Sequence, residues 1–437
     1  MTDFRADLLE DLGISGTDLK SIFEKENEEY NKVMGVTPED STDEDNEPKS
    51  EVEETIDYIK ERRENILSGN VNCIPFGFSR FEKILPGIEQ AAYYLITANT
   101  KVGKTQLTDA MFVYSVVKYM YENPGKVDAK IFYFSLEMSK REKYLQMISH
   151  VLYVYSKGKV RISPKELRSA SADKPLDEAI LSLLEDEKYM EVFRVFEEIV
   201  VIIDDIKNPF GIYKFMRTYA KDNGTMTYKI VKSVNKNTGE ITENRIFDKY
   251  IPFNSQLYVL FVVDHIALIN AEKGGTKREA IIKLSSEYCV NLRNWYNFIP
   301  VIVVQQAFAQ ESNENIKLGR VRPTLDGIGD VKVIARDANH IIGLFSPSRH
   351  GMKTYMNYDI TVFKDNIRFM EVIASREGGG NSLIPLYFDG AVNYFKELPK
   401  PTPENKDQMD KVYDTLQRIR TGNNILFLLI NKERKNL

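Results

Sequence analysis

The chain has 437 residues, of which 43% are hydrophobic and 28% are charged, a composition typical of a globular protein larger than one small core. Its longest apolar runs, such as Tyr258–Val263 and Ile299–Val304, are too short to cross a bilayer as helices, so we expect no membrane insertion. The two cysteines lie far apart and away from other metal ligands, which argues against a disulfide or a zinc site.

Charge is spread unevenly along the chain. The net charge is −5, but residues 1–60 alone carry about −13, which leaves about +8 on the rest. A mildly basic body with an acidic tail is compatible with binding a polyanion, although a solvated acidic tail without a partner is an equally good interpretation of the tail itself. The first residues carry acidic groups where a secretory signal carries basic ones, so we expect a cytoplasmic protein.

The N-terminal part divides into two predicted segments. Residues 1–50 form an acidic segment that is largely disordered by composition. Ser50 and Glu53 make a capping box for a helix over residues 51–68, whose apolar side chains fall on one side. We interpret this helix as a linker that docks on its own body or on a neighbouring subunit.

A strand, loop and helix pattern follows at residues 93–105. The apolar run ending at Ala98 leads into a short loop and then into Gly103-Lys104-Thr105, which is the P-loop pattern with Ala98 in place of the first glycine. In this pattern backbone N–H groups surround phosphate oxygens, the lysine binds phosphate and the hydroxyl binds Mg²⁺. We therefore predict an ATP and Mg²⁺ site, with nucleotide contacts from Ala98, Asn99, Thr100, Lys101, Val102, Gly103, Lys104, Thr105 and Gln106.

The remaining pattern predicts an α/β fold with a mostly parallel central sheet. Apolar strands alternate with amphipathic helices through residues 69–398, while the late runs at His340–Leu344, Tyr358–Phe363, Phe369–Ala374 and Leu383–Phe388 favour antiparallel strands at the C-terminal end. A basic and aromatic β-hairpin is predicted at about 224–256, around Gly239. Residues 399–437 are predicted to form a helical tail.

Three polar residues follow predicted buried strands. Asp264 ends a run of six apolar residues, where a carboxylate can help Thr105 to hold Mg²⁺. Glu137 is a candidate general base for an attacking water, and Gln306 is a candidate sensor of the γ-phosphate. Taken singly, such residues are also common as helix caps or solvated strand ends.

The order of these segments resembles the RecA-type motor domain of DnaB-family replicative helicases. The similarity spans residues 52–398 and rests on Pro75-Phe76-Gly77-Phe78, the P-loop with its Ala98, Phe134-Ser135-Leu136-Glu137-Met138, Ile203-Asp204-Asp205, Val262-Val263-Asp264 and Val303-Val304-Gln305-Gln306. The resemblance implies a RecA-like fold and a homohexameric ring that hydrolyses ATP between subunits, translocates 5′ to 3′ on single-stranded DNA and unwinds duplexes. It also implies contact with a primase or a helicase loader.

The resemblance assigns further residues. Arg376 matches the arginine finger that acts on the neighbouring subunit's ATP, but the second basic residue two positions earlier is Ala374, for which Arg368 or Lys364 could compensate. The reduced N-terminus fits a phage-encoded form without the family's globular N-terminal domain. Central-channel loops would bind DNA through Lys273, Lys277, Arg278, Arg320, Arg322, Lys332 and Arg336.

Two other functions remain open from the sequence. A RecA-like recombination or repair ATPase would carry similar motifs but form filaments on single-stranded DNA. A non-catalytic scaffold would bind nucleotide without turnover. The hairpin around Gly239 fits a DNA, loader or primase contact, or a decorative insertion.

Overall fold

The computed structural model describes residues 50–171, 174–234, 241–331, 333–378 and 382–420. The chain divides into two units, residues 1–61 and residues 62–437. Of the first unit, the described part is residue 50 and the first part of helix α3, Glu51–Leu67. Along α3 the apolar side chains of Val52, Ile56 and Ile59 are exposed. The acidic segment predicted at residues 1–50 lies almost wholly outside the described residues.

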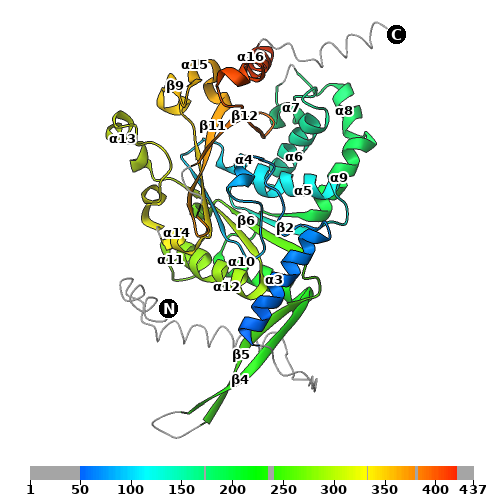
Figure 1. The fold of residues 1–437 in the computed structure, drawn as a ribbon, viewed down its shortest axis with the longest axis vertical. Coiled ribbons are helices and arrows are strands. Elements are labelled where there is room, and N and C mark those ends of the chain that lie inside the picture. Colours follow the sequence, from blue (N-terminus) through cyan, green and yellow to red (C-terminus); the bar gives the residue numbers. More distant parts are fainter. Residues whose placement is uncertain (1–49, 172–173, 235–240, 332, 379–381, 421–437) are drawn as a thin grey trace. The chain divides into compact units, whose positions relative to one another are not determined.

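The second unit is built around one nine-stranded sheet (Figure 1). Its strand order is β13-β12-β11-β8-β1-β7-β6-β2-β3. The six strands from β8 to β3 are parallel, and β11, β12 and β13 are antiparallel. The strands are β1 Tyr94–Ala98, β2 Asp128–Ser135, β3 Val200–Ile203, β6 Leu257–Asp264, β7 Ile299–Gln305, β8 His340–Phe345, β11 Ile367–Ser375, β12 Leu383–Asp389 and β13 Tyr394–Glu397. The predicted fold class is confirmed.

Helices cover both faces of this sheet. One face carries α4 Lys104–Asp109, α5 Ser115–Glu122, α6 Lys140–Tyr155 and α9 Glu187–Ile199, and the other carries α10 Pro209–Asp222, α11 Lys277–Ile282, α12 Cys289–Tyr296 and α14 Val333–Asp337. Shorter helices are α7 Pro164–Leu167, α8 Glu178–Leu184, α13 Asn313–Lys317 and α15 Ile360–Phe363, and α16 Lys406–Arg420 follows the last strand. Short helical turns are η1 Phe81–Lys83, η2 Ala110–Tyr114, η3 Ile266–Leu268, η4 Lys283–Tyr288, η5 Phe308–Glu311, η6 Asp326–Val331, η7 Ser348–His350, η8 Lys364–Asn366 and η9 Pro403–Asn405.

The strands read as continuous apolar runs because both of their faces are buried. In β1, Tyr94 and Ile96 pack into the core on the side of α4 and α6, and Leu95 packs into the core on the side of α10 and α12. Successive side chains of a strand point to opposite faces, so most positions of a strand covered on both sides are apolar. Polar residues are therefore left to the ends of the strands, where the candidate site lies.

A third core lies beneath α16, and here one prediction is wrong. The run Tyr358–Phe363 is not a strand: only Tyr358–Asp359 is extended, as β10 paired with β9 Thr354–Tyr355. The Asp359 carboxylate accepts hydrogen bonds from the N–H groups of Thr361 and Val362 and so starts α15. A capping aspartate turns an otherwise β-forming run into a helix because it satisfies the first free N–H groups.

The segment between α10 and β6 forms a separate antiparallel pair. Strands β4 Gly224–Val234 and β5 Ile241–Pro252 pair with each other and project from the edge of the unit (Figure 1). Aromatic contacts fix the base of the pair on α12, with ring centroids 5.2 Å apart for Phe247–Trp295 and for Tyr250–Tyr296. The turn predicted around Gly239 lies outside the described residues.

Among the described residues, the structure has no helix with the length and apolar character that a membrane crossing requires.

Candidate active site at the P-loop edge

The loop between β1 and α4 has the geometry of a phosphate-binding turn. Gly103 has a φ of 106°, a left-handed conformation that favours glycine, and a Cβ there would lie 3.3 Å from the ring of Phe388. The Val102 N–H bonds to the Asn99 carbonyl at 3.4 Å, which closes the turn. Helix α4 then begins at Lys104, so the free N–H groups of its first turn lie beside the loop.

Strand register brings the ends of four strands to the same edge of the sheet. Ala98 pairs with Gln305 at the end of β7, and Ser135 pairs with Asp264 at the end of β6. These are the carboxyl ends of parallel strands, where open α/β sheets place their ligands. We call this region the P-loop edge; Glu137 follows β2 directly beyond it.

Thr105, Asp264 and Lys104 form the centre of the P-loop edge. The Thr105 hydroxyl donates to Asp264 Oδ1 at 3.2 Å, although the two residues are 159 positions apart. The Lys104 side chain is buried, and burial lowers the pKa of its ammonium group, while the carboxylates of Asp264 and Glu137 oppose that shift. A hydroxyl, a carboxylate and a cation therefore converge within one site.

Asp264 is held in place by a buried polar cluster that the sequence pattern does not reveal. The Tyr133 hydroxyl donates to Asp264 Oδ2 at 2.8 Å. The Lys143 ammonium lies 4.0 Å from the centroid of the Tyr133 ring and donates to both carboxylate oxygens of Asp109 at 2.7 Å. Burial raises the pKa of Asp109, and Lys143 opposes this. The three partners come from β2, α6 and α4, so only the folded chain brings them together.

Glu137 lies at the open side of the P-loop edge. Its side chain is 62% exposed and its carboxylate is 3.7 Å from His265 Nε2. Burial and the Lys104 charge lower the pKa of His265, which favours the neutral imidazole. His265 carries no functional prediction from the sequence, yet it is the side chain that borders Glu137.

Gln305 and Gln306, at the end of β7, make different contacts. Gln306 is buried, and its amide donates to the Thr97 hydroxyl at 2.9 Å and to the Thr324 carbonyl at 3.2 Å. The amide of Gln305 instead donates to the hydroxyl of Thr100 within the P-loop. Gln306 therefore connects β1 to the segment after β7, and Gln305 is the glutamine that contacts the loop itself.

The candidate finger Arg376 lies at the opposite edge of the sheet from its own P-loop. It follows β11, where Ser375 pairs with His340 at the start of β8, and its guanidinium donates to the Arg336 carbonyl at 2.8 Å. Five strand residues separate that edge from the P-loop, roughly 17 Å. At that distance the Arg376 guanidinium does not reach its own P-loop.

The structure excludes Arg368 as a second finger. Its side chain is 1% exposed, and it donates to the Val102 carbonyl of the same P-loop at 2.6 Å while its guanidinium lies 4.6 Å from the Phe388 ring centroid. Arg368 is therefore part of the support beneath the P-loop. Lys364, the other alternative, is exposed.

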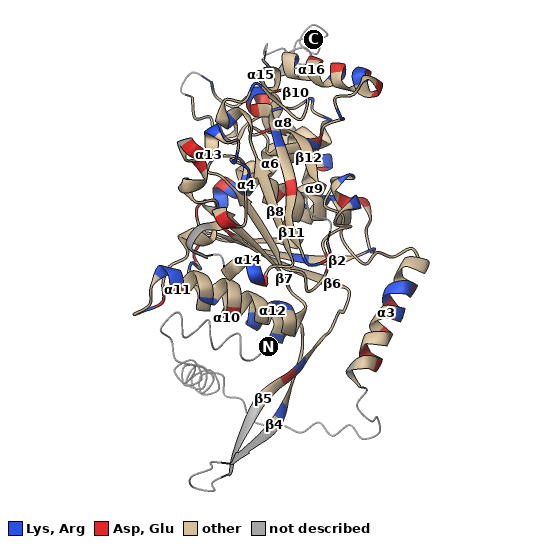
Figure 2. Ribbon diagram, turned by 60° about the vertical axis from the view of Figure 1, so that its left-hand side comes forward, with Lys and Arg blue, Asp and Glu red and all other residues tan. Residues whose placement is uncertain are grey.

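The predicted DNA-binding residues form two groups that lie side by side. Helix α11 packs beside η6 and its neighbour α14, and basic residues mark this part of the surface (Figure 2). Lys273, Lys277, Arg278, Arg320, Arg322 and Arg336 are all exposed. Arg322 forms an ion pair with Glu371 at 3.3 Å. Lys332 lies outside the described residues.

Sequence reasoning missed one exposed aromatic residue in this region. Phe308, a short step after the end of β7, has an exposed fraction of 76%, which is unusual for phenylalanine. It lies on the same segment as Arg320 and Arg322, which is tied together by bonds from the Gln310 amide to their carbonyls at 3.1 Å. Exposed aromatic side chains on basic segments are often used to stack on unpaired bases, so Phe308 could have been noted from its position after β7.

Comparison with known proteins identifies the fold. The chain is similar to a solved structure described as an ATPase domain, with 16% sequence identity, a TM-score of 0.55 and coverage of 80% of this chain and 100% of that chain. It is also similar to the structure of a DnaB-like replicative helicase described with its interactions with primase, with 16% identity, a TM-score of 0.55 and coverage of 86% and 73%. No protein-family model and no curated protein sequence matches the chain. The second unit thus has a RecA-like ATPase fold.

Proposed function

We propose that this chain is an ATP-hydrolysing DNA helicase of the DnaB-like replicative kind, which encircles single-stranded DNA as a homohexamer and unwinds duplexes. The observation that carries the proposal is the convergence of Lys104, Thr105 and Asp264 beneath the Gly103 turn. The fold shared with a DnaB-like replicative helicase supports the same reading.

The residues of the P-loop edge fit a nucleotide and Mg²⁺. The Thr105 hydroxyl and the Asp264 carboxylate supply oxygen ligands 3.2 Å apart, which are the donors that Mg²⁺ prefers. A Cβ at Gly103 would crowd the Phe388 ring at 3.3 Å, so the turn favours glycine. Mg²⁺, when bound, would neutralise negative charge on the phosphates. Nucleotide contacts are assigned to Ala98, Asn99, Thr100, Lys101, Val102, Gly103, Lys104, Thr105 and Gln106.

Different residues of the chain have different roles in ATP hydrolysis. Lys104 binds the phosphates and stabilises the charge that develops on them. Glu137, exposed and next to Lys104, accepts a proton from the attacking water. Gln305 and Gln306 connect the P-loop to the segment after β7, so a change at the phosphates is passed to Thr324 and the basic residues near it.

Arg376 completes the site of the next subunit. Its guanidinium would stabilise transition-state charge across the interface, a role worth about 10³ in rate or more. Because a subunit then needs its neighbour, hydrolysis requires an oligomer. We assign oligomer closure to residues 51–68, whose exposed Val52, Ile56 and Ile59 would dock on the adjacent subunit.

DNA contact is assigned to the two basic groups. Lys273, Lys277, Arg278, Arg320, Arg322, Lys332 and Arg336 would neutralise phosphates without reading sequence. By analogy with DnaB-like helicases we propose translocation from 5′ to 3′ and contact with a primase or a loader. The domain assignment is residues 1–50 acidic segment, 51–68 linker helix, 69–398 motor and 399–437 tail.

Turnover measurements test the catalytic assignment. Glu137→Gln should reduce ATP turnover about a hundredfold or more while nucleotide binding persists, because only the proton acceptor is lost. Glu185→Gln is a matched control at an exposed glutamate after α8, and its turnover should equal that of the parent. In the parent, single-stranded DNA should raise turnover; an unchanged rate would refute the motor function.

A subunit-mixing experiment tests Arg376. Arg376→Ala and Lys104→Ala should each be inactive alone, because each removes one half of every interface site. Mixed oligomers contain interfaces that join an intact P-loop to an intact Arg376, so activity should return on mixing. Failure to recover activity in verified mixed oligomers would place Arg376 outside the neighbouring site.

Imaging of assemblies separates the helicase from a filament-forming ATPase. With a non-hydrolysable ATP analogue and single-stranded DNA, closed rings are expected. Deleting residues 1–68 should abolish the rings, whereas a filament former would still assemble.

A further inference from the structure

A cavity of about 810 Å³ lies between β13, the C-terminal end of α6 and helix α16. We call it the α16 cavity. It is lined by Tyr153, Tyr394, Lys157, Lys396, Lys400 and Lys411, among others, and by no residue of the P-loop edge. Its walls therefore join parts of the chain that lie far apart in the sequence.

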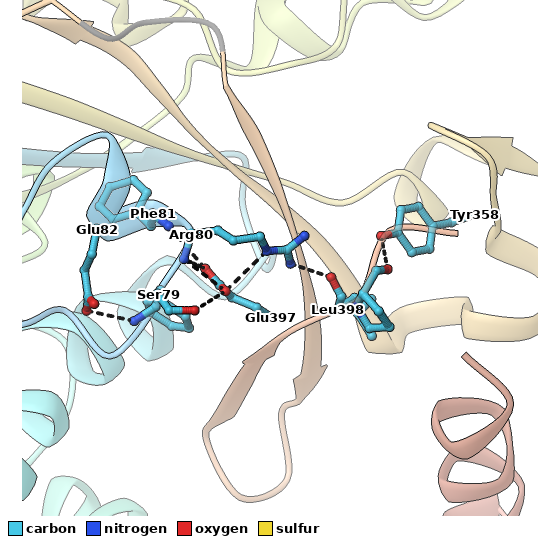
Figure 3. Close-up of polar contacts among 9 residues, drawn as sticks. Ser79, Arg80, Phe81, Glu82, Tyr358, Glu397 and Leu398 are labelled. Carbon is cyan, nitrogen blue, oxygen red and sulfur yellow. Dashed lines mark hydrogen bonds and ion pairs between the residues drawn. The ribbon is translucent and has the colours of Figure 1, made fainter. Parts of the chain in front are cut away.

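Among the described residues, Glu397 is the one carboxylate that lines the α16 cavity, and it already has partners. Glu397 accepts hydrogen bonds from the Arg80 N–H at 2.9 Å, the Phe81 N–H at 3.2 Å and the Ser79 hydroxyl at 3.2 Å, and it forms an ion pair with the Arg80 guanidinium at 3.3 Å (Figure 3). The same guanidinium also donates to the Leu398 carbonyl. Arg80 and Glu397 thus neutralise each other and tie residues 79–81 to β13.

Within the part of the chain that the structure describes, the charged side chains that line the α16 cavity besides Arg80 and Glu397 are four lysines. Lys157 follows α6, Lys396 lies in β13, Lys400 follows that strand and Lys411 lies on α16. Within the described part of the chain, none of these ammonium groups has an ion-pair or hydrogen-bond partner. Like charges that converge on one concave surface repel each other and raise the local concentration of anions.

Three tyrosines, Tyr153, Tyr387 and Tyr394, also line the α16 cavity. Tyr387 is 6% exposed, and its buried hydroxyl finds no hydrogen-bond partner within the described residues. Burial raises the pKa of Tyr153 to about 12 and raises that of Tyr387 as well, so both remain neutral donors. A buried hydroxyl without a partner is costly, so this part of the wall lacks an acceptor among the described residues.

We propose that the α16 cavity is a second phosphate-binding site, which takes a nucleotide either free or as part of a single strand. Its volume lies in the range of small-molecule sites and far exceeds a single anion. Compact ammonium groups suit phosphate, tyrosine rings suit a base, and the Gln408 side-chain amide offers both a donor and an acceptor. This site is distinct from the one that hydrolyses ATP.

Binding in a Lys104→Ala background tests the site, because that change removes the phosphate-binding lysine of the P-loop edge. Full-length protein is titrated with ATP, inorganic triphosphate, adenosine and a short oligothymidylate. A photoreactive azido-ATP and a thiothymidine-containing strand are then crosslinked and the modified peptides mapped. ATP and triphosphate are expected to bind and adenosine is not, and crosslinks should map to the segments that carry Tyr153 and Tyr394.

Charge reversal provides the matched comparison. Lys400→Glu together with Lys411→Glu should weaken binding about tenfold or more, since both cations become anions. Lys214→Glu with Lys221→Glu makes the same change at exposed positions of α10 and should shift affinity less than about twofold. Lys157→Glu is a second cavity variant, at a position after α6. If it also weakens binding, a folding defect caused by the Lys400 and Lys411 changes is not the explanation.

The outcomes are decisive in each direction. Crosslinks from azido-ATP alone identify a free nucleotide as the ligand, and crosslinks from the strand identify nucleic acid. Loss of all binding with Lys104→Ala, or equal affinity in the cavity and control variants, would overturn the proposal. ATP turnover of the parent is measured separately, so the catalytic proposal can fail without this one.

Discussion

The P-loop edge and the α16 cavity both gather cations, but they do so in different ways. At the P-loop edge, Lys104 is buried, and the neighbouring Asp264 accepts bonds from Thr105 and Tyr133. In the α16 cavity the lysines are exposed and carry no partner among the described residues, because Glu397 is paired with Arg80 instead. The first region fixes each polar group in one geometry, and the second provides charge with little orientation.

This difference follows from what each region is built on. Strands that hydrogen-bond in register hold the P-loop edge, and buried polar groups there must be paired. The α16 cavity is closed by side chains on α6 and α16, where a lysine can stay solvated. We therefore expect substitutions to change rate at the P-loop edge and affinity, in a salt-dependent manner, at the α16 cavity.

The largest expected effect is the loss of the P-loop cation. Lys104→Ala should lower ATP turnover about a thousandfold, roughly 4 kcal/mol, because a preorganised charge at the reacting phosphates is removed. Steady-state turnover measures this. Lys400→Ala, which removes a cation from the α16 cavity instead, is the control and should keep the parental rate. If both variants lost ATP turnover, the P-loop edge and the α16 cavity would belong to one site.

Next in size is the buried pair behind Asp264. Lys143→Met leaves the Asp109 carboxylate buried without its partner and should lower the free energy of unfolding by about 3 kcal/mol or more. Denaturant unfolding measures this. Lys143→Met combined with Asp109→Leu should recover much of the loss, since an apolar pair leaves no buried charge. If the single and double variants were equally unstable, packing and not charge would be the cause.

Acid should weaken the side of the sheet that carries the α16 cavity. His150, one turn before Tyr153, stacks on Tyr114 and donates from Nδ1 to the Asn393 carbonyl at 3.0 Å. Burial lowers the pKa of His150 from 6.5 to about 4, while the Lys118 charge adds to that shift. Between those pH values the unfolded chain binds a proton that the folded chain excludes, so stability is full above pH 6.5 and falls as pH drops toward 4.

The expected loss is about 3 kcal/mol across that window. Unfolding free energies between about pH 7 and pH 4.5 check it, and His150→Phe, which keeps the ring but not the proton site, should flatten this part of the profile. An unchanged slope in that variant would assign the acid sensitivity to other groups.

A smaller effect is expected one contact away from the proposed Mg²⁺ ligands. Tyr133→Phe removes the hydrogen bond to Asp264 and leaves the ring that packs against Lys143, so turnover should fall about tenfold with an increased requirement for Mg²⁺. Tyr121→Phe, which loses an exposed bond to Glu191, is the matched control. A fall in turnover without any change in Mg²⁺ dependence would contradict a positioning role for Tyr133.

The smallest effect is the response to salt. In a Lys104→Ala background, raising the ionic strength from about 0.05 M to 0.2 M should weaken nucleotide binding to the α16 cavity a few-fold, because its charges are exposed and screened. Affinity measured by titration should be lowest in the high-salt samples. Salt-independent binding would indicate an enclosed site and contradict the exposed lysine geometry.

Much of the fold follows from local sequence signals. The position of β1, the turn at Gly103 and the helix after it depend on residues that are neighbours in sequence, so the P-loop could be predicted from them. The continuous apolar runs also consist of residues adjacent in sequence, so they could predict a sheet buried on both faces. The error at Tyr358–Phe363 arose because Asp359 caps a short helix, and a cap overrides a weak preference of the few residues after it.

The support of the site could not be predicted in this way. Lys143, Tyr133 and Asp109 look like ordinary helix and strand residues in the sequence, and their contacts depend on how α6 packs over β2. The sequence left Arg368 as an alternative for the second basic residue near Arg376, whereas in the structure Arg368 is buried beneath Val102. Long-range partners of this kind carry no periodic signal.

The sequence by itself determined that a glycine-containing turn with the P-loop pattern lies between a buried strand and a helix, because the glycine, lysine and threonine that make this pattern are adjacent in the chain. Only the tertiary structure decided which carboxylate meets Thr105, which arginine supports the turn and which lysines surround the α16 cavity. Strand register and helix packing set those distances, and both depend on the whole chain being folded.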